Sequence, residues 1–385
     1  MRTARCDVWG SELSPFTLKV LALCRHAGVD ARLLPATGAR ATNLRALATV
    51  NLVRRRWRRP RFPKLSELDE LPLVPYLIGP SREVVVDSSA IATWLDERAE
   101  PDAPRAVPRD GAVRFAARLI DEYFDELGLY FAHHNRWVVS AATNDAGERL
   151  AREFRSFLPR ALRQRVADGF SARQVRRLPY LFSVAPADPE RYDLPPARRP
   201  PGRVGFPPTH DLLDTGFRRI LDRLETMLRA QAFIFGTTFT VADASAYGQL
   251  AMNLDDESVA ASMELRAPSA VAWARRMRAG GAISSISEPP QLTPALVPLL
   301  EEIAATFIPL MRQNEAAFEA ARSRGARRFN EDAFDRGECL FDGVLFERPF
   351  RTVVKTFQVR VWRDLQREWR ALDSSEKARL PLTLE

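Results

Sequence analysis

Cysteine is one of the scarcest residues in this 385-residue chain. Its three cysteines, Cys6, Cys24 and Cys339, lie far apart in the sequence. A disulfide framework or a cysteine-based zinc site would need more cysteines at closer spacing, so the sequence argues against both and predicts no bound metal. So few cysteines suit a reducing compartment, and we expect the protein to be cytoplasmic.

Long apolar runs are also missing. No stretch of about 18 or more apolar residues occurs, so we expect no membrane-spanning helix. The N-terminal residues 1–10 contain no apolar segment of the kind found in a signal peptide. Hydrophobic residues nevertheless make up 46% of the chain, which is enough for a large core. The length predicts two domains, or two domains with an extension.

Lysine is nearly absent, although the chain is basic. Of the 57 basic residues only four are lysine, so 53 are arginine, and the formal net charge is +8 at pH 7. We interpret the arginine excess as genome bias more than as function. The densest cluster, Arg54 to Arg61, can be a phosphate-binding patch, a solvated loop or a wall that attracts an anionic ligand. Because no RRM, KH or zinc-finger pattern accompanies it, we do not expect a nucleic-acid partner.

The most informative stretch runs from Leu71 to Leu95. Its apolar start ends at Val74-Pro75, a Gly-Pro-Ser turn signal follows, and residues 84–86 have the pattern of a short strand. Asp87 then fits the N-cap of a helix with one apolar face. Proline cannot donate to a strand ladder, so we predict a cis peptide bond there that turns a backbone edge toward a ligand.

The N-terminus of that helix has the chemistry of an anion site. Its unpaired N–H groups and partial positive charge suit a carboxylate. Ser88 adds a hydroxyl, and Asp87 can pair with an ammonium group of the same ligand. The alternative is that Asp87 and Ser88 only cap the helix.

Together these features resemble the second half of a glutathione transferase N-terminal domain. In that family a V-P pair and a hairpin precede an acidic-Ser pair, an Ile and an aromatic-Leu pair. The matching residues here are Val74-Pro75, Asp87-Ser88, Ile91 and Trp94-Leu95. The resemblance implies an α/β thioredoxin-like domain with glutathione as co-substrate. It also implies that the backbone of Val74, before a cis Pro75, and the side chains of Asp87 and Ser88 hold the tripeptide.

Ser14 is the predicted catalytic residue. It follows a predicted strand at Cys6–Trp9 and fits the N-cap of a helix that begins with Pro15. The Ser14-Pro15-Phe16 turn resembles that of serine-type glutathione transferases, the plant tau class most closely, in which the hydroxyl donates to the glutathione sulfur. A free thiol has a pKa of about 8.5, and a donor at a helix N-terminus stabilises the thiolate. Ser14 can instead be only an N-cap, and Ser11 is an alternative donor.

Cysteine-based chemistry is the less favoured alternative. Cys24 lies inside the predicted first helix and not at the Ser14 position, which argues against omega-type thiol transfer. A glutathione-dependent thiol reductase acting through Cys6 stays open.

A second, all-α domain is expected after a proline-rich linker at residues 101–110. Apolar residues then recur at three- and four-residue steps. The resemblance implies that Tyr130, His134 and Trp137 line a pocket for a small hydrophobic electrophile. The alternative is that these side chains serve packing and hydrogen bonding between helices. Adjacent histidines do not share a helix face, so a paired metal site at 133–134 is not expected.

A further motif spans residues 236–243. Thr240 and Asp243 have the spacing of a capping box, and the small residues that follow suit a closely packed helix. The segment resembles the G-x-x-x-[ST]-x-A-D motif in the helical domain of glutathione transferases, so we assign Asp243 a structural role. The whole resemblance covers about residues 4–280.

The predicted organisation has four parts. They are a thioredoxin-like domain at 1–100, the linker at 101–110, an all-α domain at 111–283 and an α-helical extension at 284–385. The extension has wide apolar faces that need a partner surface, which the helical domain can supply. The implied activity is attack of the glutathione thiolate on an electrophilic carbon, as in detoxification, by a bacterial-type transferase that can form a homodimer. The alternative is a non-catalytic binding or interaction protein on the same fold.

Overall fold

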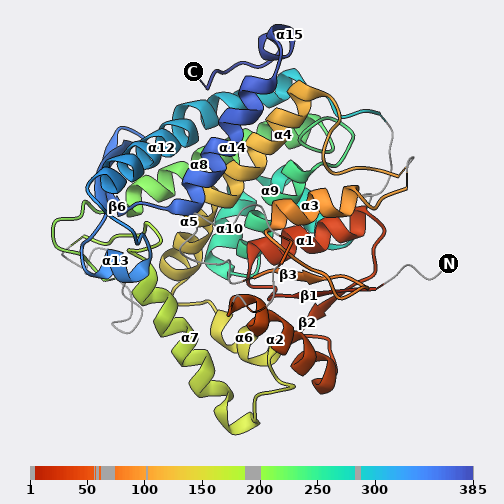
Figure 1. Ribbon diagram of the computed structural model, residues 1–385, viewed down its shortest axis with the longest axis vertical. Helices are drawn as coiled ribbons and strands as arrows, with labels where there is room; N and C mark the ends of the chain where they lie inside the picture. The colour runs from red at the N-terminus through yellow and green to blue at the C-terminus, as the bar shows by residue number, and fades with distance from the viewer. Residues whose placement is uncertain are drawn as a thin grey trace.

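The computed structural model describes residues 5–55, 57, 60–61, 74–100, 103–186, 201–281 and 288–384 (Figure 1). Several predicted features lie partly outside these ranges. They are the start of the central stretch at 71–73, the linker residues 101–102, part of the arginine cluster at 56 and 58–59, and the beginning of the extension at 284–287.

The N-terminal domain is built on a four-stranded sheet with the strand order β2-β1-β3-β4. Its strands are β1 (Cys6–Trp9), β2 (Ala31–Leu34), β3 (Tyr76–Ile78) and β4 (Val84–Val86). β1 and β2 are parallel, whereas β3 pairs antiparallel with both β1 and β4. A parallel pair needs a crossover connection, and helix α1 (Pro15–His26) supplies it.

Helices cover both faces of this sheet (Figure 1). The other helices of the domain are α2 (Arg40–Arg54) and α3 (Ser88–Asp96). Because successive strand residues point to opposite faces, Val8 and Leu77 are buried in one core with α1 and α3, and Trp9 and Tyr76 in another with α2. This arrangement confirms the predicted α/β thioredoxin-like domain.

The second domain is all-helical, as predicted. Its helices are α4 (Gly111–Tyr123), α5 (Leu129–His134), α6 (Ala146–Glu153), α7 (Arg163–Arg177), α8 (His210–Ala230), α9 (Val241–Asn253), α10 (Glu257–Arg266) and α11 (Pro268–Arg278). Two π-helical turns, Phe124–Gly128 and Asn135–Val139, flank α5. Such turns are often found at functional sites, and the first of them carries Asp125.

Helix α9 of the second domain packs against α1 of the first domain. All of its residues are buried, and its small side chains let α1 approach closely. A Cβ atom at Gly248 would lie 2.3 Å from the Pro15 carbonyl oxygen, so only glycine fits there. The Asp243 carboxylate accepts hydrogen bonds from the backbone N–H groups of Thr240, at 2.9 Å, and Ile234, at 2.8 Å. Asp243 therefore holds the start of α9 and the preceding loop together.

The C-terminal extension packs along α4 (Figure 1). Its elements are α12 (Val297–Ser323), α13 (Glu331–Asp335), β5 (Leu340–Leu345), β6 (Arg348–Val353), α14 (Thr356–Ala371) and α15 (Ser374–Ala378). The ring of Phe115 on α4 lies 5.2 Å from that of Trp369, and the ring of Tyr123 lies 5.9 Å from that of Phe307. The extension thus shares one core with the helical domain.

The extension is not helical throughout, because β5 and β6 form an antiparallel hairpin that the sequence pattern did not predict. Its two-residue turn, Phe346-Glu347, has positive φ angles of 51° and 61°. Asn-Gly or Asp-Gly pairs normally mark such turns, so this hairpin lacks the usual sequence signal.

Among the described residues one helix, at Pro294–Ser323, is long and apolar enough to cross a membrane by length and composition alone. More than half of its most apolar window, 56%, is buried inside the protein. It packs against α14, α4 and α8, which is the behaviour of a core helix.

Candidate functional site

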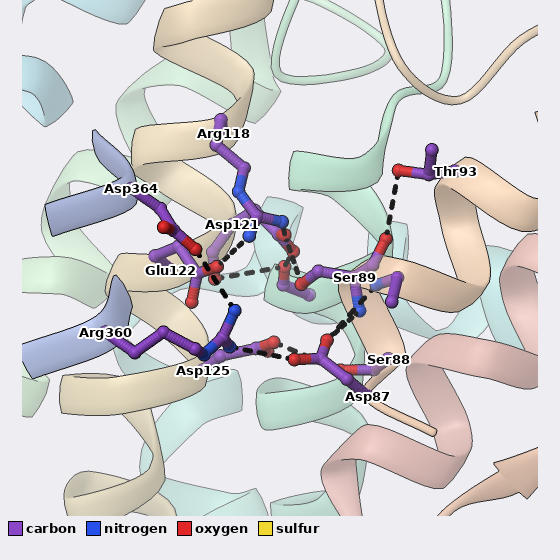
Figure 2. Close-up of polar contacts among 12 residues, drawn as sticks. Asp87, Ser88, Ser89, Thr93, Arg118, Asp121, Glu122, Asp125, Arg360 and Asp364 are labelled. Carbon is purple, nitrogen blue, oxygen red and sulfur yellow. Dashed lines mark hydrogen bonds and ion pairs between the residues drawn. The ribbon is translucent and has the colours of Figure 1, made fainter. Parts of the chain in front are cut away.

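The N-terminus of α3 is the best-defined polar site (Figure 2). Asp87 caps this helix, since its Oδ1 accepts hydrogen bonds from the backbone N–H groups of Ser89, at 2.9 Å, and Ala90, at 3.1 Å. Its φ angle of 81° lies in a region that residues with side chains rarely adopt. Strained backbone of this kind persists where the surroundings hold it, often at ligand sites.

The second carboxylate oxygen of Asp87 faces the extension. Arg360 on α14 donates from Nη2 to Asp87 Oδ2 at 2.9 Å, and both side chains are buried. Nη1 of the same guanidinium contacts Asp364 Oδ2 at 3.2 Å. An element far from the family-like part of the sequence therefore reaches the predicted ligand-binding carboxylate.

A buried lysine lies beneath this helix end. Lys19 Nζ on α1 lies 2.5 Å from Asp121 Oδ1 and 2.7 Å from Asp125 Oδ2, and it donates to Ser89 Oγ at 2.9 Å. Ser88 Oγ donates to Asp125 Oδ2 at 3.2 Å. These contacts connect α1 and α3 of the thioredoxin-like domain to α4 and to the π-helical turn after it.

Burial and charge set the protonation of this cluster. Burial opposes the charge on Lys19, but Asp121 and Asp125 outweigh it and raise the lysine pKa. Burial also opposes the charge on Asp121, yet Lys19 and Arg118 hold its pKa below the ordinary value. Burial raises the pKa of Asp125 to about 7, with Lys19 offsetting it only in part. Burial and the neighbouring Asp125 raise the pKa of Glu126 to about 8.

The peptide bond between Val74 and Pro75 is cis, as predicted, and it leads into β3. Val74 is half-buried against the core that contains Trp9. Phe154 and Phe157, from the segment after α6, pack on the same core.

The turn before α1 is tied to the helical domain from two sides. Ser14 Oγ accepts a hydrogen bond from Thr17 N–H at 3.4 Å, so Ser14 is an N-cap in this structure. The carboxylate of Glu153 accepts from the backbone N–H of Glu12 at 3.0 Å, and burial raises the pKa of this carboxyl group to about 6. From the other side Arg136 Nη1 donates to the Leu13 carbonyl at 3.0 Å.

The sequence pattern did not predict the roles of four residues, Arg136, Glu153, Lys19 and Arg360. Arg136 is buried, and its Nε pairs with Asp256 at 2.8 Å. The sequence signal for such residues is weak because a buried arginine and an exposed one look alike among 53 arginines. Only Lys19 had a signal that could have been noticed, since it is one of four lysines in the chain and lies on an otherwise apolar helix face.

The three residues predicted to line a substrate pocket all lie in packed surroundings. The ring of Tyr130 is stacked on Phe182 at 5.1 Å, and its hydroxyl accepts from Gln358 Nε2 at 2.9 Å. His134 lies with its ring 5.0 Å from that of His210, and burial lowers its pKa well below the ordinary value. Trp137 packs against Phe170 and belongs to a separate core with Leu13. Their contribution to electrophile binding stays a prediction.

A cleft of about 630 Å³ opens between α3, α4 and α14. Its lining includes Asp87, Ser89, Trp94, Arg118, Arg360 and Asp364. Neither Ser14 nor any of Tyr130, His134 and Trp137 lines it. The structure therefore brings Asp87 to an open cleft and keeps the three predicted pocket residues apart from it.

Two described arginines of the cluster contact other side chains of the same domain. Arg54 lies 5.9 Å from the centre of the Tyr76 ring, and Arg61 pairs with Glu97 at 3.4 Å. In the described ranges, no group of three or more His, Cys, Asp or Glu side chains is arranged to hold a metal ion.

Two family profiles match the sequence. The one described as glutathione S-transferase, N-terminal domain, matches residues 13–98, and the one described as glutathione S-transferase, C-terminal domain, matches residues 207–253. No curated protein sequence matches the chain.

Solved structures that align with this chain come from several organisms. The glutathione S-transferase from Rhodospirillum rubrum F11 is 14% identical, covers 76% of this chain and 99% of its own, and has a TM-score of 0.39. The corresponding values for the beta-etherase LigF from Sphingobium sp. strain SYK-6 are 17%, 77%, 99% and 0.39. For the glutathione S-transferase of Ceriporiopsis subvermispora, solved in complex with glutathione, they are 16%, 74%, 99% and 0.40.

The two profiles follow one another in the order of the two domains seen in the structure. The first begins after β1 and spans α1 to α3 of the thioredoxin-like domain, including Asp87 and Ser88. The second spans all of α8 and all of α9 with its capping box. Residues 13–98 and 207–253 thus match the N- and C-terminal domains of the glutathione S-transferase family.

Proposed function

We propose that the protein binds glutathione and transfers its thiolate to a small hydrophobic electrophile. The observation that carries the proposal is the N-terminus of α3, where the strained, acidic Asp87 lines an open cleft and is followed directly by Ser88. In this scheme Asp87 pairs with the α-ammonium group of the ligand, and Ser88 with its α-carboxylate. The backbone of Val74, before the cis Pro75, binds the cysteinyl part.

Ser14 is the proposed catalytic residue. Its hydroxyl, at the N-terminus of α1, would donate to the glutathione sulfur and stabilise the thiolate over the thiol. Lowering a thiol pKa by two units requires about 2.7 kcal/mol of differential stabilisation. One hydrogen bond to a charged group together with the helix field is of this size.

Substitution of Ser14 by alanine should lower turnover of glutathione with 1-chloro-2,4-dinitrobenzene by about tenfold or more, because one charge-stabilising donor is lost. The measurement is the initial rate of conjugate formation by purified wild type and variant at equal concentration. Ser11→Ala is the matched control, since Ser11 lies in the same turn and its Oγ accepts from Leu13 N–H at 3.1 Å. Loss of turnover in Ser11→Ala with full turnover in Ser14→Ala would move the role to Ser11.

A non-catalytic binding protein is the second candidate. Two observations favour it: Ser14 caps α1, and the Asp87 carboxylate is already paired with Arg360. Glutathione binding without conjugate formation, for a panel of aryl halides, epoxides and enones, would establish this alternative.

The thiol-reductase alternative has little support. Cys6 is buried, and burial together with Glu83 raises the pKa of its thiol to about 11. A protonated, buried thiol is a poor nucleophile. A cytoplasmic location and a homodimer remain expectations, the latter tested by light scattering after size-exclusion chromatography.

A further inference from the structure

We propose that Arg360 of the C-terminal extension is a ligand-binding residue that receives the α-carboxylate of the γ-glutamyl group. Asp87 would bind the neighbouring α-ammonium group. This inference rests on the proposed glutathione site and adds to it a residue beyond both segments matched by the family profiles, 13–98 and 207–253.

Arg360 is held firmly in place at the end of α3. It lies 273 positions from Asp87 in the sequence, and its side chain is 9% exposed. The guanidinium carbon lies 4.5 Å from the centre of the Phe357 ring, one turn earlier on α14. Asp364, one turn later, contacts its Nη1. Contacts on both sides thus fix the guanidinium before any ligand arrives, which lowers the entropic cost of binding.

Arg360 and Asp87 place a positive and a negative charge side by side, and these complement the carboxylate and the ammonium group of an α-amino acid. The γ-glutamyl end of glutathione carries an ammonium and a carboxylate on one carbon atom. Arg360 and Asp87 lie 2.9 Å apart and both line the 630 Å³ cleft. Figure 2 shows the two side chains approaching each other from α14 and α3. A zwitterion entering from the cleft can therefore contact both charges at once.

The chemistry of each group fits this division. A guanidinium presents five N–H donors in a planar fork, so it can hold more than one carboxylate, and it binds carboxylates in a bidentate way. A carboxylate such as Asp87 accepts only, and it suits an ammonium. Binding would replace one internal ion pair by two ion pairs with the ligand. The competing arrangement is a closed site, in which Arg360 takes the place of the ammonium and excludes the ligand.

Three thiol tripeptides separate these arrangements by calorimetric titration. They are reduced glutathione, γ-aminobutyryl-cysteinyl-glycine, which lacks the α-carboxylate, and glutaryl-cysteinyl-glycine, which lacks the α-ammonium. Arg360→Gln should weaken binding of glutathione and of the glutaryl peptide by about 10- to 100-fold, the range for one charge-assisted hydrogen-bonded contact. Binding of the γ-aminobutyryl peptide should be unchanged or tighter.

Arg363→Gln is the matched control. Arg363 lies on the same helix and pairs with Glu315 at 2.9 Å, away from the cleft. It should bind all three peptides as the wild type does. Arg360→Lys keeps the positive charge but lacks the planar fork of donors, so we expect an intermediate affinity for glutathione. This variant replaces Arg360→Gln in the test if Arg360→Gln is poorly folded.

The remaining outcomes are distinct. Tighter binding of glutathione by Arg360→Gln would mean that Arg360 closes the site, and equal binding would mean that it does not touch the ligand. Either result overturns this inference and leaves the proposed glutathione site standing. Absence of binding of all three peptides to the wild type would overturn the proposed function as well.

Discussion

Replacing Lys19 by methionine is expected to destabilise the protein by about 3–5 kcal/mol, the range seen when one partner of a buried ion pair is removed. The lysine side chain is 1% exposed and contacts two carboxylates, Asp121 and Asp125. Without Lys19 these two acids would be buried beside each other with less compensation. Methionine keeps most of the side-chain volume, so packing alone would not produce such a loss. Urea denaturation followed by circular dichroism measures the change.

Two further variants test the electrostatic cause. Lys377→Met, at a partly exposed lysine on α15, should change the free energy of unfolding by less than about 1 kcal/mol. The triple variant Lys19→Met, Asp121→Asn, Asp125→Asn removes the charges together and should recover part of the lost stability. A loss below about 1 kcal/mol in Lys19→Met alone would contradict the proposed contribution of this cluster to the free energy of unfolding.

Stability should fall as pH rises from 5.5 to 8.5. Asp125 and Glu126 have pKa values raised to about 7 and about 8, mainly by burial. The unfolded chain loses these protons near pH 4, so between about pH 4 and 8 the folded protein binds more protons than the unfolded chain. Stability therefore decreases through this window, by about 1.4 kcal/mol for each unit by which a pKa is raised. Above the pKa values of Asp125 and Glu126 in the folded protein, these two groups cause no further loss of stability.

Asp125→Asn isolates the contribution of one group. Lys19 on α1, Ser88 on α3 and Asp121 on α4 face this carboxyl group, and asparagine keeps its shape and an acceptor for the first two. Thermal denaturation at several pH values should give a shallower pH dependence for the variant than for the wild type. Asp332→Asn, at an exposed residue of α13, should leave the slope as it is. Equal slopes for wild type and Asp125→Asn would assign the effect to other groups.

Local features of this fold were predictable from the sequence. The strand at Val84–Val86, the cap at Asp87 and the box at Thr240 and Asp243 each depend on residues within a few positions of one another. Turn chemistry, β-branched side chains and capping residues act over that range. The cis bond before Pro75 belongs to the same class.

Long-range contacts were not predictable in the same way. Lys19 meets Asp125 across 106 positions, and Asp87 meets Arg360 across 273. Such pairs depend on how α4 and α14 pack on the first domain, which no local pattern encodes. The hairpin of β5 and β6 was missed because its turn has no glycine or asparagine. The helix cap at Asp87 was therefore predictable, whereas its ion-pair partner Arg360 was not.

Calorimetric titration of reduced glutathione into wild type and Ser88→Ala tests whether glutathione binds at the Asp87-Ser88 end of α3. We expect micromolar-to-millimolar binding by the wild type and an affinity lower by about tenfold in the variant, because one hydrogen bond to the ligand carboxylate is lost. Absence of heat, together with no rise in melting temperature at several millimolar glutathione, would mean that glutathione does not bind there, since a ligand that binds the folded state must stabilise it.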